Sequence, residues 1–358
     1  MLAEKRLLLW VCCLFCCAAS GFAQERARTV RQSGSAGTQE QQAEDVVHVN
    51  TRVVFIDALV RDKRTNLPVR GLTREDFQVL DNGRPRALTY FTREGDARRP
   101  LALVLCLNLD YIGARRYLER EDVRASLAAA LARLAPEDEV AVMAVWETMG
   151  GKPIMVAGLT RDRAKAVAAL APPPDAAEAS KSARPVSVMN EATQAAIDIA
   201  RRERPNSQVV FLYVSDGFAT NDMLEFGSRE TLAGRLIEGN VNFSALTCDM
   251  LKGMSAAVAV ASVPLRILGA SITGGEQYLA KQTGGVAVKV SRPEEFGAGL
   301  QQITTGLASR YSLGFTLGEN ERDDGQMHRL EVKVKAKDPQ GRGRKLTVSA
   351  RRGYYPKR

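Results

Sequence analysis

Few residues of this chain are of the types that perform acid–base or nucleophilic catalysis. The 358 residues include two histidines, His48 and His328. A Ser-His-Asp or Cys-His arrangement therefore has few possible bases. His48 borders a polar stretch, and His328 begins a segment predicted to be a β-strand, where a structural role is the simpler interpretation. The sequence favours a protein that is not an enzyme.

The cysteines do not predict a metal site. Four of the six lie between residues 12 and 17, in a segment that we expect to be removed, which leaves Cys106 and Cys248. Neither has the spacing of a metal-binding cluster. Both lie in or at the end of apolar runs, which favours buried thiols. A disulfide stays open as an alternative, because an exported protein can oxidise a pair whose Cα atoms lie within about 7 Å.

Glycine-rich segments do not predict a phosphate-binding loop. Neither Gly269 to Gly275 nor Gly284-Gly285 is followed by the lysine of the Gly-x-x-x-x-Gly-Lys-Ser/Thr motif. These glycines indicate helix boundaries instead. Nucleotide binding therefore has no motif in its favour.

The formal charge of +9 does not by itself indicate a nucleic-acid partner, since lysines and arginines are dispersed along the chain. Clustered cations near the C-terminus could contact nucleic acid or anionic lipid, because they release counterions. Alternation from Leu346 to Ala350 favours a solvated strand face, and we predict no nucleic-acid partner. The residues concerned are Arg342, Arg344, Lys345, Arg351, Arg352, Lys357 and Arg358.

The first 23 residues have the parts of an export signal. Lys5 and Arg6 precede an apolar run from Leu7 to Ala19, and Gly21-Phe22-Ala23 provides a small-x-small cleavage site. A membrane anchor is the competing interpretation, but the run is short for a bilayer and no later segment has about 18 uninterrupted apolar residues. We predict a signal peptide over 1–23, no transmembrane segment after its removal, and a periplasmic, cell-surface or secreted protein.

Composition and periodicity divide the remainder into segments. Hydrophobic residues at 45% and charged residues at 25% are typical of a globular protein. Residues 24–45 contain almost no large apolar side chain, which predicts a disordered tether. Residues 46–98 alternate in short runs, Val53 to Val60, Phe77 to Leu80 and Ala87 to Phe91, with an Asn82-Gly83 turn, and this predicts antiparallel strands.

From about residue 99 to 308 apolar runs alternate with helical periods, which predicts an α/β fold. Leu101 to Leu107 is apolar throughout, as is typical of a buried parallel strand. Ser291 to Glu294 predicts a capping box that opens a helix through Leu307. Further strands are predicted over Glu139 to Trp146, Val209 to Val214, Val241 to Thr247 and Val286 to Val290.

Strands return over 309–358, in Tyr311 to Leu317, Leu330 to Ala336 and Leu346 to Ala350. Each flanking segment has too few strands to bury a face alone. We therefore predict one discontinuous β-sandwich, built from the N- and C-terminal flanks, with a doubly wound α/β domain inserted in it.

Motifs at both ends of this region resemble the acidobacterial-type von Willebrand factor A (VWFA)-related domain proteins. The resemblance covers about Val46 to Pro356. It rests on Val60 to Lys63 running into Gly71-Leu72-Thr73-Arg74-Glu75-Asp76-Phe77 and on Asp81-Asn82-Gly83. It also rests on Tyr311-Ser312-Leu313-Gly314-Phe315, His328 to Val334 and Ala350 to Tyr355. The middle is similar to a von Willebrand A domain in strand order and in Ser215-Asp216-Gly217.

The resemblance implies a metal-ion-dependent adhesion site at the carboxyl ends of the strands, where ligands of open α/β sheets bind. The family's Asp-x-Ser-x-Ser motif is altered here: Asn108 stands for the first acid, Asp110 for the first serine, and Ile112 offers no oxygen. Ser187 aligns with a later threonine, and Asp216 matches the remaining acid. The implied site is a degenerate one that binds Mg²⁺ or Mn²⁺ through Asn108, Asp110, Ser187 and Asp216, or that binds a partner without a metal.

These features predict an exported, non-catalytic protein-binding or adhesion-type module. One alternative is a metal-dependent hydrolase that uses the same acids, with Glu191 or Asp249 as the general base. Another is a purely structural envelope protein. Met254 to Leu268 is predicted to be either a partner contact or a packed connection.

Overall fold

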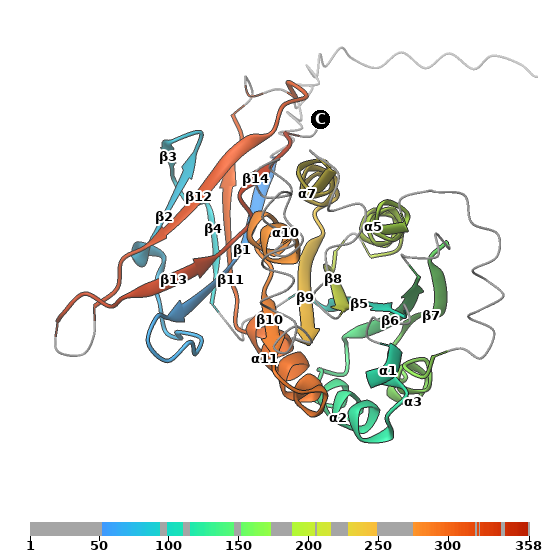
Figure 1. The fold of residues 1–358 in the computed structure, drawn as a ribbon. Helices are drawn as coiled ribbons and strands as arrows, with labels where there is room; N and C mark the ends of the chain where they lie inside the picture. The colour runs from blue at the N-terminus through green and yellow to red at the C-terminus, as the bar shows by residue number, and fades with distance from the viewer. Residues whose placement is uncertain are drawn as a thin grey trace, which may run out of the picture. The chain divides into compact units, whose positions relative to one another are not determined.

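The computed structural model describes residues 52–93, 99–109, 115–146, 152–172, 188–204, 206–215, 228–248, 275–318, 321, 323–337 and 341–356. All of them belong to one unit, Asn50–Arg358. Within these ranges, the backbone forms one mostly parallel central sheet, two antiparallel sheets and helices (Figure 1). The predicted signal peptide and tether lie outside the described residues.

The central sheet has the strand order β10-β9-β8-β5-β6-β7. Neighbouring strands are parallel except β6 and β7. The chain runs outward from β5 in one direction to β7, then returns beside β5 as β8 and continues outward to β10, so the order reverses between β5 and β8. The strands are β5 (Leu101–Asn108), β6 (Glu139–Val145), β7 (Ile154–Thr160), β8 (Gln208–Ser215), β9 (Asn242–Cys248) and β10 (Ala287–Val290).

Helices cover both faces of this sheet, which explains the unbroken apolar sequence of β5. Leu103 and Leu105 face a core shared with α2, α3 and α11, whereas Val104 and Cys106 face a core shared with α5, α7 and α10. The α/β architecture with a mostly parallel sheet is thereby confirmed. The helices are α1 (Arg115–Leu118), α2 (Glu121–Leu131), α3 (Arg163–Ala168), α5 (Val188–Asp198), α7 (Ser228–Gly239), α10 (Gly275–Thr283) and α11 (Phe296–Ala308).

The two antiparallel sheets have the orders β13-β1-β11-β4 and β14-β12-β2-β3. Each contains strands from before the central sheet and strands from after it. Alternate residues of β1, Ile56, Ala58 and Val60, lie in one core with residues of both sheets. The strands are β1 (Val53–Asp62), β2 (Phe77–Asp81), β3 (Arg84–Arg86), β4 (Tyr90–Thr92), β11 (Tyr311–Thr316), β12 (His328–Val334), β13 (Leu346–Ser349) and β14 (Gly353–Tyr354).

The hairpin turn agrees with the prediction, but the strand expected after it does not form as one piece. Asn82 and Gly83 have φ values of 47° and 82°, and they join β2 to β3. Of the segment expected over Ala87 to Phe91, only Tyr90 and Phe91 lie in a strand. Arg84–Arg86 pairs with β2, and Tyr90–Thr92 pairs with β11, so the chain changes sheets between them.

Two further differences concern short elements. The sequence analysis missed β7, an antiparallel edge strand whose side chains are mostly half-buried or exposed. The expected capping box at Ser291 to Glu294 is also shifted. Arg292 is the N-cap residue of a 3₁₀ turn over Pro293–Glu295, and Glu295 accepts the hydrogen bond from the backbone N–H of Ser291.

Among the described residues, no helix is long and apolar enough to span a membrane.

Candidate functional site

The carboxyl edge of the central sheet, at the point where the strand order reverses, gathers buried polar side chains. Asn108 is the last residue of β5, and Ser215 is the last residue of β8, its neighbour. Because the two strands are parallel, both residues come to the same edge of the sheet. Open α/β sheets bind ligands at this position.

Asn108 is buried and its amide is held by a tyrosine of the neighbouring strand. Its Nδ2 donates a hydrogen bond of 2.8 Å to the Oη atom of Tyr213. The carbonyl oxygen Oδ1 of an asparagine is the hydrogen-bond acceptor of its amide and the atom that can coordinate a hard cation.

Ser215 is hydrogen-bonded to a buried carboxylate of helix α10. Its hydroxyl donates to Oε1 of Glu276 on α10 at 2.7 Å, and Glu276 is only 2% exposed. A hydroxyl group that donates one hydrogen bond keeps acceptor capacity on its oxygen. Asn108, Ser215 and Glu276 thus bring amide, hydroxyl and carboxylate oxygens to the carboxyl edge.

Of the site residues predicted from sequence, Asn108 is the one that the structure describes. Asp110, Ser187 and Asp216 lie outside the described residues. Asp110 follows Asn108 by two positions and Asp216 follows Ser215 directly. In the described ranges, no group of three or more His, Cys, Asp and Glu residues is arranged to hold a metal ion.

Sequence reasoning missed Glu276. The sequence signal is a helical period: Glu276, Leu279, Ala280 and Thr283 occupy positions i, i+3, i+4 and i+7 of one helix face, and all are buried. A carboxylate on the core-facing side of a helix is unusual, because burial of a charge is costly unless it is hydrogen-bonded.

The other residues singled out by sequence divide between described and undescribed segments. Cys106 and Cys248 are buried thiols. Glu191 lies on α5, half-buried, while Asp249, Met254 to Leu268 and His48 lie outside the described residues.

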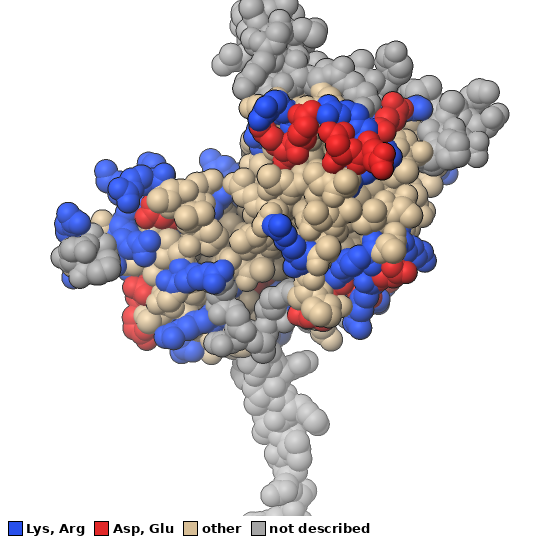
Figure 2. Space-filling view, turned by 90° about the horizontal axis from the view of Figure 1, so that it is seen from below, with Lys and Arg blue, Asp and Glu red and all other residues tan. Residues whose placement is uncertain are grey.

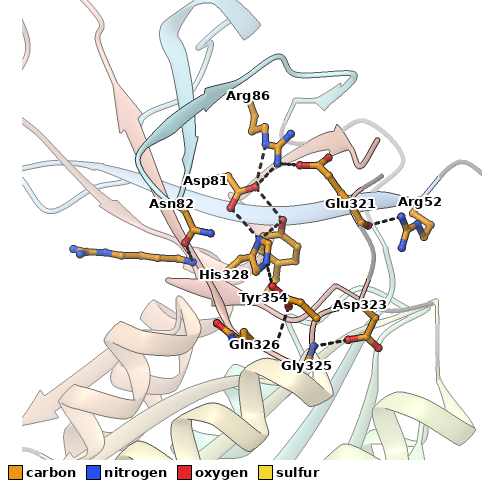
Figure 3. A network of polar contacts seen from close by, with 12 residues as sticks. Arg52, Asp81, Asn82, Arg86, Glu321, Asp323, Gly325, Gln326, His328 and Tyr354 are labelled. Carbon is orange, nitrogen blue, oxygen red and sulfur yellow. Dashed lines mark hydrogen bonds and ion pairs between the residues drawn. The ribbon is translucent and has the colours of Figure 1, made fainter. Parts of the chain in front are cut away.

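His328 belongs to a second polar cluster, in the antiparallel sheets (Figure 3). Asp81 at the end of β2 accepts two hydrogen bonds from Arg86 of β3, at 2.7 and 3.0 Å, and one from the hydroxyl of Tyr354 of β14, at 3.0 Å. His328 of β12 lies with Nδ1 3.5 Å from Asp81 Oδ1. Arg86 also pairs with Glu321.

Charge and burial act together in this cluster. Burial, followed by the nearby Asp81 carboxylate, raises the pKa of Tyr354, so the phenol stays protonated and donates. Hydrogen bonding to Arg86 lowers the pKa of Glu321. The strands that supply these residues come from both flanks of the chain: β2 and β3 precede the central sheet, and β12 and β14 follow it. We therefore interpret the cluster as a structural contact that holds the two flanks together.

No protein-family model matches the sequence, and no curated protein is significantly similar to it. Two solved structures are similar at low identity. Proximal thread matrix protein 1 from the mussel byssus is 16% identical, with a TM-score of 0.35 over 62% of this chain and 49% of that chain. Human COPII-coat protein Sec24c is 10% identical, with a TM-score of 0.36 over 73% of this chain and 44% of that one.

This chain therefore spans about half of the mussel chain and less than half of the human chain. At these TM-scores, neither similarity supports a conclusion about fold family or function.

Proposed function

We propose that this chain is an exported, non-catalytic protein-binding module of the von Willebrand A type, related to the acidobacterial VWFA-domain proteins. One observation supports the proposal above all. Asn108 and the hydrogen-bonded Ser215–Glu276 pair lie at the ends of neighbouring parallel strands, at the carboxyl edge where the strand order reverses. The family assignment itself rests on the sequence motifs, and fold alone does not specify function.

The residues at this edge fit a hard divalent cation such as Mg²⁺ or Mn²⁺, because the polar atoms that they offer are oxygens. The amide of Asn108 is already oriented by Tyr213. In the proposal Asp110 and Asp216 are the charged ligands, Asn108 and Ser187 the neutral ones, and a partner's carboxylate completes the coordination. Glu276 holds the hydroxyl of Ser215, the residue that directly precedes Asp216 in the sequence.

The proposed partner is a protein that presents a carboxylate, not a nucleic acid. Figure 2 shows lysine and arginine side chains in separate groups, interspersed with acidic ones, on the viewed face of the molecule. Such a face lacks the continuous basic surface on which phosphate-backbone binding depends.

A crosslinking pull-down with the mature chain tests this function. We expect partners that are captured in Mg²⁺ or Mn²⁺, released by a chelator, and lost with Asp110→Ala and Asp216→Ala. Glu331→Gln serves as a matched control, because Glu331 is an exposed acid on β12. Capture that is unchanged in both aspartate variants would contradict the proposal.

A further inference from the structure

Three arginines from separate connections of the chain meet at one cavity of about 30 Å³. Arg99 lies just before β5, Arg310 just before β11, and Arg351 just before β14. The cavity is also lined by Asp57 of β1 and by residues of α7, β8 and β9. All of these residues belong to the same unit of the chain.

Positive charge exceeds negative charge at this cavity. Its lining includes three arginines and one acid, Asp57, for a net charge of +2. Asp57 is already engaged, since it pairs with Arg99 and accepts a hydrogen bond of 2.7 Å from the Ser312 hydroxyl. The charges of Arg310 and Arg351 therefore have no carboxylate of their own among the lining residues.

Several donors at the cavity have no acceptor among the residues that the structure describes. Arg310 is 7% exposed, and its Nη2 donates to the carbonyl of Gly284 at 2.6 Å. Its Nε atom is buried without a hydrogen-bond partner among the described residues, as are Arg351 Nε and Gln208 Nε2. Arg351 donates from its two other nitrogens, to Asn240 Oδ1 at 3.1 Å and to the carbonyl of Phe55.

Buried cations with unused donors are costly, because they lose hydration without gaining a counter-charge. Desolvation lowers the pKa values of Arg310 and Arg351 to about 10, with the nearby Asp57 opposing the shift. Both side chains therefore still carry a positive charge at neutral pH. An anion in the cavity would accept from the unused donors and balance the charge.

We propose that this cavity binds an oxyanion, a phosphate or carboxylate group, through Arg310, Arg351 and Gln208, with Arg99 supplying further positive charge. Guanidinium groups match the geometry of such groups. The small volume restricts this site to a compact anionic group. A second cavity of about 670 Å³ adjoins it, shares Arg99 and Arg351 with it, and is also lined by Phe55 and Tyr90. The rings of Phe55 and Tyr90 meet edge to face at 5.1 Å, which offers an apolar wall for the remainder of a larger ligand.

An anion bound at this location would also stabilise the folded protein. Arg99 and Arg310 lie at the two connections between the antiparallel sheets and the central sheet, and Arg310 donates a hydrogen bond to the carbonyl of Gly284, the residue after α10. A bound anion would link these connections and so stabilise the folded chain by mass action.

The test is thermal unfolding and titration calorimetry of the mature chain with sodium phosphate, against sodium chloride at equal ionic strength, which controls for screening. We expect a saturable rise in Tm and saturable heat with phosphate, and affinity at least about tenfold weaker in Arg310→Gln, since one charge-assisted contact is lost. Arg292→Gln removes the same charge from an exposed position and should bind as the unchanged chain does.

Phenyl phosphate and benzoate distinguish the sources of the anionic group. If these aromatic anions bind more tightly than phosphate, the natural ligand is a larger molecule whose apolar part contacts Phe55. If they bind equally or more weakly, the natural ligand is a free anion. Should Arg310→Gln fail to fold, Gln208→Leu and Arg351→Gln replace it with the same expected loss. The proposal is overturned if neither phosphate, phenyl phosphate nor benzoate binds saturably, or if binding is equal in all of these variants.

Discussion

Asp81 shows how a single buried carboxylate can join distant parts of a chain. It is 3% exposed, and its partners Arg86, Tyr354 and His328 come from three other strands. A buried charge is tolerated when it is paired and hydrogen-bonded, and becomes strongly destabilising when a partner is removed. The stability of the antiparallel sheets should therefore depend on Arg86 more than on Arg84, the other arginine of β3.

Arg86→Met should lower the free energy of unfolding by about 2 kcal/mol or more, because Asp81 loses its cation while Tyr354 and His328 remain. Urea denaturation measures this change. Arg84→Met, an exposed position on the same strand, should change it by less than about 0.5 kcal/mol. Equal effects of the two substitutions would show that Asp81 does not need its cation.

The Ser215–Glu276 pair leads to a second expectation at this scale. Ser215→Ala should cost about 1–3 kcal/mol, because a buried carboxylate loses a hydrogen bond. Ser126→Ala is the matched control: its hydroxyl bonds to a carbonyl of its own helix, and alanine favours a helix, so the change should be near zero. A Ser215→Ala protein as stable as the control variant would mean that water replaces the lost contact.

At the scale of elements, the sequence predicted buried and strongly periodic segments best. The observed β5, β8 and β9 lie within one residue of their predicted bounds. Burial on both faces makes β5 almost wholly apolar, and it gives β8 an unbroken apolar run from Val209 to Val214. The strand predicted over Ala87 to Phe91 was wrong in its bounds, because the observed strand begins at Tyr90. Alternation of apolar residues does not reveal that the chain passes from one sheet to the other just before this strand. The edge strand β7 was missed because partial exposure weakens its pattern.

The candidate site was partly predictable for the same reason. The strand pattern predicted the position of Asn108 at the end of β5, and the family resemblance implied its role in the site. The place of Glu276 in the site could not be predicted from the sequence. It depends on the packing of α10 against the end of β8, which brings together residues 61 positions apart. Asp110, Ser187 and Asp216 stay predictions.

The turn between α10 and β10 depends on close backbone packing. A Cβ atom at Gly285 would lie 1.6 Å from the carbonyl oxygen of Phe243. Gly285→Ala should therefore destabilise the protein by about 3 kcal/mol or more, since backbone of β9 would have to move. Gly158→Ala, on the edge strand β7 with nothing within 4 Å of the added atom, should be nearly neutral by thermal unfolding. Similar melting temperatures for both variants would contradict this packing.

At the scale of the whole described unit, both sheets of the flanking region contain strands from each end of the chain. Ion pairs join distant parts of the chain both in the central region and between the two flanks. Arg204, which precedes β8, pairs with Glu139 at the start of β6, and Arg86 of β3 pairs with Glu321 beyond β11. Stability should therefore respond to pH through these carboxylates.

Hydrogen bonds from Arg204 and Arg86 lower the pKa values of Glu139 and Glu321 below the ordinary 4.5. The contribution of each carboxylate to stability is thus complete above pH 4.5 and is lost as the pH falls through its lowered value in the folded state. Urea unfolding between pH 7 and pH 3 should show this loss. The double variant Glu139→Gln/Glu321→Gln should be less stable at pH 7 and show a shallower decline, and an unchanged pH profile would contradict the assignment.

Calorimetric titration of Mg²⁺ and Mn²⁺ into the mature chain tests whether the carboxyl edge of the central sheet binds a metal ion. We predict saturable heat that disappears in Asp216→Ala and persists in Glu331→Gln. Absence of heat in the unchanged chain, or heat that survives in Asp216→Ala, would contradict a metal site at this edge.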